Sequence, residues 1–177
     1  MMETNGVNLL STVIYLLLIF AAAIISVLGS IWILTFLTRK SIQEKKEIIQ
    51  RHNIGTAMVL GAFIWTIGHM CYETIQPIMN VWYVNYPAGI GLKTGLLFFL
   101  GVIASLIVAL ISGALVVFMA LKLLMGITRD IDEWEEIRSG NIAVAVVMGV
   151  TVVVLGMFFE TIISSICLTL FNSLKLI

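Results

Sequence analysis

The feature that most constrains this chain is the spacing of its charges. Four windows without Asp, Glu, Lys or Arg cover residues 4–38, 52–72, 94–121 and 139–159. A charge near the centre of a bilayer costs at least about 2.5 kcal/mol, and a helix needs about 20 apolar residues to cross the hydrocarbon core. Because 60% of the residues are hydrophobic and only 11% are charged, a soluble surface is excluded. We therefore predict an all-α protein with four transmembrane helices, at residues 8–38, 53–76, 94–124 and 141–163.

The basic residues predict the orientation of these helices. Eight of the ten Lys and Arg lie in the first and third connections, which are cytoplasmic by the positive-inside rule. Both termini and the middle loop then lie on the outer side of the membrane. No basic segment precedes the first window, so we expect a retained helix and no cleaved signal peptide. In the middle loop the aromatic residues Trp82, Tyr83 and Tyr86 suit the membrane interface, and we expect Pro77, Pro87 and Gly89 to interrupt any helix there.

A repeat relates the two halves of the chain. At an offset of 88 residues, five positions of the first copy recur in the second: Asn53, Ile54, Ala57, Gly61 and Gly68 match Asn141, Ile142, Ala145, Gly149 and Gly156. After a slip of one residue, Glu73 matches Glu160. Each copy has two helices, so both copies cross the membrane in the same sense. We predict one domain, residues 1–177, built from parallel repeats at about 8–80 and 94–174.

Several residues have predicted structural roles. Asn53 and Asn141 are expected to cap the helices that follow them, with a contact to a ligand as the alternative role, and Gly140 suits the end of a short helix from about residue 130 to 139. Small side chains at helical spacing permit close packing of helices in lipid, with the lining of a pore as the alternative. The predicted packing positions are Gly61, Gly68, Gly101, Ser105, Ala109, Gly113, Gly149 and Gly156.

The two cytoplasmic connections carry opposite charge. Residues 39–51 have a net charge of +3, and residues 127–138 have a net charge of −3. We expect these loops to pair within one chain, to pair around a homo-oligomer or to bind a protein partner. The alternative is that both are solvated surfaces, with the basic loop near anionic lipid headgroups. The overall net charge of zero predicts no nucleic-acid binding.

Three ionisable residues in apolar sequence are the candidates for function: His69, Glu73 and Glu160. His69 and Glu73 are four residues apart, so they share one helical face and can approach each other. If the helices continue past the two Glu residues, the carboxylates lie within the bilayer and favour an ion or proton pathway. If the helices end there, both Glu residues are interfacial.

The sequence carries no recognisable catalytic motif, and its His and Glu residues are too few at ligand spacing for a metal site. We expect a protein without enzymatic activity, metal or cofactor. Cys71 and Cys167 lie near the predicted outer ends of their helices. Free thiols are expected there, with a disulfide as the alternative.

The segment DIDEWEEIRSGNIAVAVVMGVTVVVLGM, with a weaker first copy in EKKEIIQRHNIGTAMVLGAFIWTIGH, resembles the duplicated motif of domain-of-unknown-function family 350. The resemblance is carried in the second copy by Glu136, Ile137, Gly140, Asn141, Ala143, Ala145 and Gly156, and in the first by Glu47, Asn53, Ala57 and Gly68. It implies a small four-helix prokaryotic inner-membrane protein and no particular activity.

Two functions fit these observations. The first is an oligomeric membrane component that works with protein partners, for example in envelope maintenance. The second is an ion or proton channel or small transporter that uses His69, Glu73 and Glu160.

Overall fold

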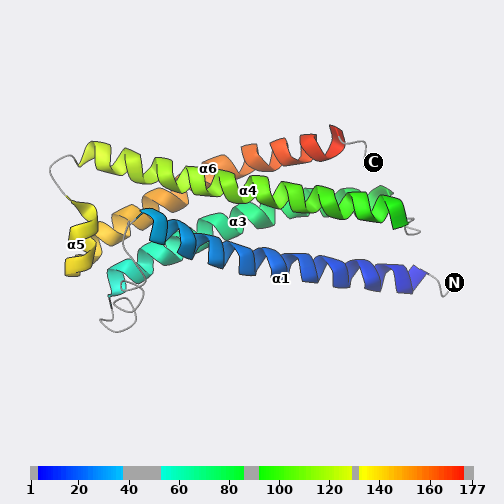
Figure 1. The fold of residues 1–177 in the computed structure, drawn as a ribbon, viewed down its shortest axis with the longest axis horizontal. Helices are drawn as coiled ribbons and strands as arrows, with labels where there is room; N and C mark the ends of the chain where they lie inside the picture. Colours follow the sequence, from blue (N-terminus) through cyan, green and yellow to red (C-terminus); the bar gives the residue numbers. More distant parts are fainter. Residues whose placement is uncertain (1–3, 38–52, 86–91, 129–131, 174–177) are drawn as a thin grey trace.

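The computed structural model describes residues 4–37, 53–85, 92–128 and 132–173 of the 177-residue chain. These residues form five helices and no strand: α1 (Thr4–Leu37), α3 (Ile54–Asn85), α4 (Leu92–Ile127), α5 (Glu133–Ser139) and α6 (Ile142–Ser173). Four long helices lie side by side, and the short α5 crosses one end of the bundle (Figure 1). The all-α prediction is therefore confirmed for the described residues.

Three of the described helices are long and apolar enough to cross a membrane: Ile54–Val81, Gly95–Ile127 and Ile142–Ser173. Each has more than the roughly 20 residues that the hydrocarbon core requires. In α1, the apolar segment found among the described residues is shorter and runs from Ile19 to Trp32. The chain is thus a multi-pass membrane protein, while a span by α1 stays a prediction.

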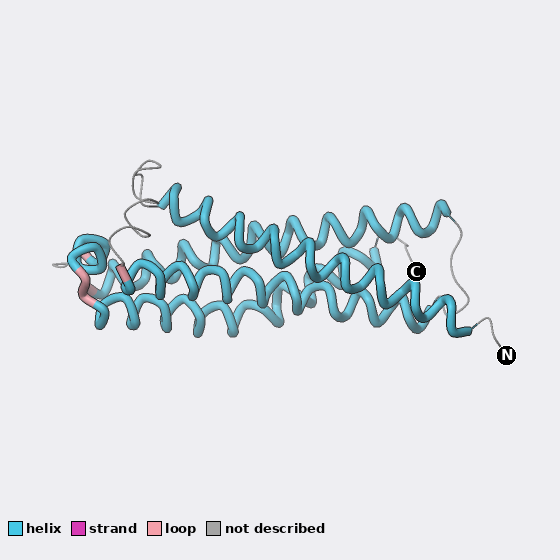
Figure 2. Tube along the Cα trace, turned by 90° about the horizontal axis from the view of Figure 1, so that it is seen from below, coloured by secondary structure: helices cyan, strands magenta, loops and turns pink. Residues whose placement is uncertain are grey.

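The long helices run in two opposite directions. α1 and α4 run one way and α3 and α6 the other, so that α3 lies parallel to α6 (Figures 1 and 2). α3 and α6 form the most extensive contact in the molecule, α4 packs against both of them, and α1 packs mainly against α3. The centre of the bundle is therefore the parallel pair of α3 and α6.

Small residues bring α3 and α6 close together along their length. A Cβ atom added to Gly55 would lie 3.2 Å from that of Ala145, and one added to Gly149 would lie 3.4 Å from that of Ala62. At Gly156 an added Cβ would overlap the methyl group of Thr66. This spacing is the close backbone approach by which helices associate in lipid.

Most of the other predicted packing positions lie against a neighbouring helix or are buried, and one does not have a close neighbour. Gly68 faces Ser26 of α1, and Gly113 faces Ile67 and Met70 of α3. The remaining α4 positions are also buried: Gly101, Ser105 and Ala109. At Gly61, by contrast, a Cβ would meet nothing within 4 Å, so this predicted position has no close neighbour among the described residues. The interface lies one residue further on, at Ala62, because that side of α3 faces α6.

The helix ends near α5 are closed by side chains. Asn53 Oδ1 accepts a hydrogen bond from the Thr56 N–H (3.0 Å), and Asn141 Oδ1 accepts one from the Val144 N–H (3.4 Å), so each Asn caps its helix. Their amide groups reach α5: Asn53 Nδ2 donates to the Ile137 and Arg138 carbonyls, and Asn141 Nδ2 donates to the Glu136 carboxylate.

α5 has caps of its own, and these fix its length. It begins after Asp132, whose side chain accepts a hydrogen bond from the Glu135 N–H, and it ends at Gly140 in the left-handed region (φ 96°). Through the amide groups of Asn53 and Asn141, the helix then ties the starts of α3 and α6 together.

Adding a methyl group at Gly156 tests the central contact. Gly156→Ala should destabilise the protein by about 1–3 kcal/mol relative to Gly61→Ala, because only the first crowds a neighbouring helix. Both variants gain the same helix propensity, so the difference reports packing alone. Combining Gly156→Ala with Thr66→Ser, which removes the crowding methyl group, should restore stability. Thermal unfolding in detergent measures the three variants, and equal stability of Gly156→Ala and Gly61→Ala would contradict the contact.

Candidate functional site

The candidate ionisable residues lie within long helices and not at their ends. α3 continues 12 residues beyond Glu73 to Asn85, and α6 continues 13 residues beyond Glu160 to Ser173. His69 is 15 residues after the first residue of α3, which places it about 22 Å from that end and near the middle of the helix. The expectation that Pro77 interrupts the helix is wrong, since Pro77 lies inside α3. Pro87 and Gly89 lie outside the described residues.

A hydrogen bond from α6 explains how α3 tolerates Pro77. Proline has no N–H, so the carbonyl of Glu73, four residues earlier, lacks its usual helical donor. The hydroxyl of Ser164 donates to this carbonyl at 2.8 Å. A neighbouring hydroxyl is one of the groups that satisfy such freed carbonyls within membranes. Glu73 therefore contributes its main-chain oxygen to this contact between α3 and α6.

His69 and Glu160 form the site. They lie four residues before Glu73 on α3 and four residues before Ser164 on α6, respectively. Nδ1 of His69 lies 2.7 Å from Oε2 of Glu160, and their side chains are 34% and 19% exposed. Sequence spacing suggested Glu73 as the neighbour of His69, but the residue in contact is Glu160 of α6. The two contacts have the same sequence separation, 91 residues, because α3 and α6 are parallel.

The pair can hold a proton in either of two positions. When Glu160 is ionised it only accepts, so the imidazole Nδ1–H is the donor; when Glu160 is protonated, its O–H donates to a bare Nδ1. The same 2.7 Å geometry serves both states. A group of this kind can take up, pass on and release a proton, which is the chemistry associated with ionisable residues in membrane helices.

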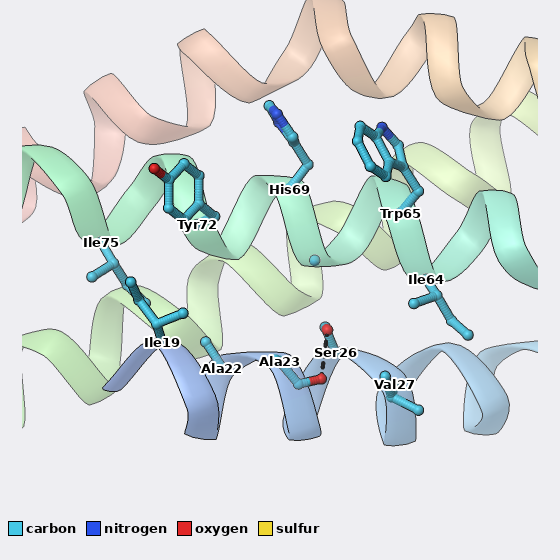
Figure 3. A pocket seen from close by; sticks show the side chains of 11 residues that line it. Ile19, Ala22, Ala23, Ser26, Val27, Ile64, Trp65, His69, Tyr72 and Ile75 are labelled. Carbon is cyan, nitrogen blue, oxygen red and sulfur yellow. Dashed lines mark hydrogen bonds between the residues drawn. The ribbon is translucent and has the colours of Figure 1, made fainter. Parts of the chain in front are cut away.

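Aromatic side chains of α3 flank His69. The Trp65 ring stacks on the imidazole (5.7 Å between centroids, 27° between planes), and the Tyr72 ring lies 6.4 Å away on the other side. The Tyr72 hydroxyl accepts a hydrogen bond from Gln76 Nε2 at 2.6 Å. In Figure 3, His69 points from α3 toward α6, between Trp65 and Tyr72. The imidazole is thus held by one carboxylate and two aromatic neighbours.

A groove of about 350 Å³ runs between α1 and α3 beside this pair. Apolar residues of both helices line most of it, and Trp65, His69 and Tyr72 belong to its α3 side (Figure 3). On α1, the hydroxyl of Ser26 donates to the Ala23 carbonyl of its own helix at 2.8 Å. The ionisable site and the groove therefore share His69.

Other potential ligand groups are not assembled in the described part of the chain. Within it, no group of three or more His, Cys, Asp and Glu side chains has the geometry to hold a metal ion. Cys71 and Cys167 are both free and buried, and Cys167 Sγ contacts the Ser105 carbonyl at 3.7 Å. Thr66 has a buried hydroxyl without a hydrogen-bond partner, in the contact with Gly156.

Residues 97–174 match the model of a protein family described as Domain of Unknown Function (DUF350). The predicted family resemblance is confirmed. Comparisons with curated proteins and with solved structures found no match. The DUF350 match includes Glu160 and Ser164 but neither His69 nor Pro77, so it covers the α6 half of the site.

The sequence analysis named His69, Glu73 and Glu160 but missed both contacts between α3 and α6, from Glu160 to His69 and from Ser164 to the Glu73 carbonyl. Ser164 could have been suspected as a donor, because a proline inside an apolar segment implies a carbonyl that needs one. The aromatic neighbours Trp65 and Tyr72 lie at helical spacing from His69 and could have been noted on the same face. The pairing of His69 with Glu160 had no such signal, since it depends on how α3 and α6 are rotated.

Removing the Ser164 hydroxyl tests the proline contact. Ser164→Ala should destabilise the protein by about 1–3 kcal/mol, because it leaves the part-buried Glu73 carbonyl without a donor. Pro77→Ala should rescue this variant, since an alanine in place of the proline supplies the missing N–H within α3. Ser165→Ala is the matched control, because that exposed hydroxyl bonds only the Thr161 carbonyl of its own helix. Thermal unfolding measures the series, and an equal loss in both serine variants would disprove the assignment.

Proposed function

We propose that this protein moves protons across the membrane, as a small channel or transporter, with His69 and Glu160 as its proton-transfer pair. The observation that supports this best is the 2.7 Å contact between His69 Nδ1 and Glu160 Oε2 in the middle of long apolar helices. Glu73, the third candidate from the sequence, has a supporting role through its main-chain carbonyl.

The cost of burying these groups is the physical argument for a function. An ionisable side chain within a membrane is expensive, and such residues usually mark ion or proton pathways. If positions 69 and 160 served helix packing alone, apolar side chains there would have a lower free-energy cost in the membrane. Histidine is also the side chain whose ordinary protonation range lies closest to neutral pH. A histidine hydrogen-bonded to a carboxylate therefore suits proton transfer better than transport of a larger ion.

We further propose the membrane arrangement predicted from the sequence: four spans in the cell inner membrane, with both termini outside and no enzymatic activity. The length of α1, 34 residues, and its position alongside α3 support a fourth span. The end of α1, the start of α3 and α5 lie at the same end of the bundle (Figure 1). The charged segments 39–51 and 127–138 connect there, which supports one cytoplasmic end.

Proton flux into liposomes tests this function. With a pH-sensitive dye inside and an imposed pH gradient, the wild-type protein should acidify the lumen. Glu160→Gln and His69→Gln should each reduce the flux about a hundredfold, the lower range for a positioned proton-transfer group. Glu73→Gln is the matched control and should retain flux. Equal flux through wild type and Glu160→Gln would disprove the proposal.

A second candidate function, the oligomeric membrane component, is favoured by the exposure around His69. Trp65 is 59% exposed and the His69 side chain 34% exposed in the single chain. Polar side chains at membrane depth usually face a protein interior or a water-filled cavity, so a second copy or a protein partner would shield this face. The charged segments would then be further partner contacts, with envelope maintenance as the role. Residues 39–51 lie outside the described residues.

Substituting Trp65 tests this second candidate. In nanodiscs we expect the wild-type protein to form dimers or larger assemblies, and Trp65→Ala to shift them toward monomers. Trp32→Ala is the matched control, because Trp32 is 68% exposed but lies on α1 away from the site. Mass measurements on single nanodiscs provide the readout. Monomers for the wild type, or an equal effect of both tryptophan variants, would exclude assembly through this face.

A further inference from the structure

The two parts of α3 on either side of His69 differ in polarity. Toward Asn85, four polar side chains are exposed or half-buried: Tyr72, Glu73, Gln76 and Asn80. Toward the start of the helix, residues 57–64 carry no polar side chain. Thr66 also lies on that side of His69, with its hydroxyl buried in the contact with Gly156. Polar groups therefore line α3 mainly in the part that ends opposite α5.

Three of these side chains form a row that begins beside His69. Tyr72, Gln76 and Asn80 are spaced by four residues, so they share one face of α3. The Tyr72 ring lies 6.4 Å from the imidazole of His69, on the same side of the helix (Figure 3). Its hydroxyl accepts a hydrogen bond from Gln76 Nε2 at 2.6 Å. The row thus leads, turn by turn, from the proton-transfer pair toward the end of α3.

The row begins within the hydrocarbon part of the membrane. The span Ile54–Val81 has 28 residues, or about 42 Å of helix, whereas the hydrocarbon core is about 30 Å thick. A core centred on this span covers about residues 58–77. Tyr72 then lies inside the hydrocarbon, Gln76 near its edge and Asn80 at the level of the headgroups. Since polar side chains at such depth usually face a protein interior or a water-filled cavity, their exposure in the single chain favours contact with water.

The same helix offers no such row between His69 and the end that carries α5. There, Met58 is exposed but apolar, and Gly61 is exposed and has no side chain. Val59 and Phe63, which point into the bundle, are fully buried. In the described part of α3, polar groups that could hold water therefore approach His69 from one end of the membrane.

We propose that water reaches His69 from the end of the bundle opposite α5, along the row formed by Tyr72, Gln76 and Asn80. The hydroxyl and the two amides supply the donors and acceptors that ordered water needs. Protons enter and leave the pair of His69 and Glu160 by this route, on the outer side in the proposed membrane arrangement. The inference rests on the proposed function and adds its direction: a site open to one side belongs to a transporter and not to an open channel.

Cysteine labelling compares water access on the two sides of His69. Tyr72→Cys and Gly61→Cys are placed in nanodiscs, where both ends are open to solvent, and treated with a trimethylammonium methanethiosulfonate. Both positions lie inside the hydrocarbon core, but Tyr72→Cys should react at least about tenfold faster, because the cationic reagent is excluded from lipid and enters only with water. The wild-type protein gives the background, since Cys71 and Cys167 are buried. Intact mass measures the labelling.

A second variant, His69→Cys, places the thiol at the site itself and keeps the test valid if Tyr72→Cys fails to fold. It should also react faster than Gly61→Cys. Equal labelling of Gly61→Cys and the other two variants would overturn the proposal, because water would then enter from both ends. Labelling of none of them would overturn it as well, since lipid or a second copy of the chain would cover the row.

The labelling result is independent of proton flux. If the wild-type protein carries no flux but Tyr72→Cys and His69→Cys react, the proposed function fails and the water route stands. If flux depends on Glu160 but neither thiol reacts, the water route fails and the proposed function stands.

Discussion

The contact between α3 and α6 is the interaction on which the rest of the structure depends. Glycine or alanine on one helix meets a small side chain on the other at Gly55, Ala62 and Gly156, so the two backbones approach closely. This short distance between the backbones lets side chains of α6 reach α3. Ser164 reaches the Glu73 carbonyl, and Glu160 reaches His69. Close packing is therefore the condition for polar groups to be satisfied within the membrane.

The sequence predicted the features that depend on neighbouring residues. Charge-free windows indicated the helices, and Asn53 and Asn141 were recognisable as caps because a cap bonds an N–H three residues away. The partner of His69 was not predictable in this way. Spacing of four residues pointed to Glu73, but side chains on one helix can share a face and still point to different neighbours. Likewise, local propensity predicts a break at Pro77, and a tertiary hydrogen bond from Ser164 overrides it.

The site departs from the symmetry that the predicted repeat would impose. Asn53 and Asn141 use their side chains alike, as caps that also donate toward α5. At the same offset of 88 residues, His69 falls on Met157, which is exposed. A symmetrical bundle would hold two polar pairs between α3 and α6, whereas the described residues show the one made by His69 and Glu160. The predicted repeat is therefore not symmetrical at this position, which is ionisable in the first half of the chain and apolar in the second.

The His69–Glu160 contact and the hydrogen bond to the Glu73 carbonyl are linked through a short part of α6. Glu160 and Ser164 are one helical turn apart, and each makes its bond across the interface to α3. A movement of α6 that separates Glu160 from His69 also takes Ser164 away from the Glu73 carbonyl. That carbonyl cannot turn to its own helix, because Pro77 has no N–H to offer. Separating His69 from Glu160 in this way therefore also leaves the Glu73 carbonyl without a donor, one turn before the proline of α3.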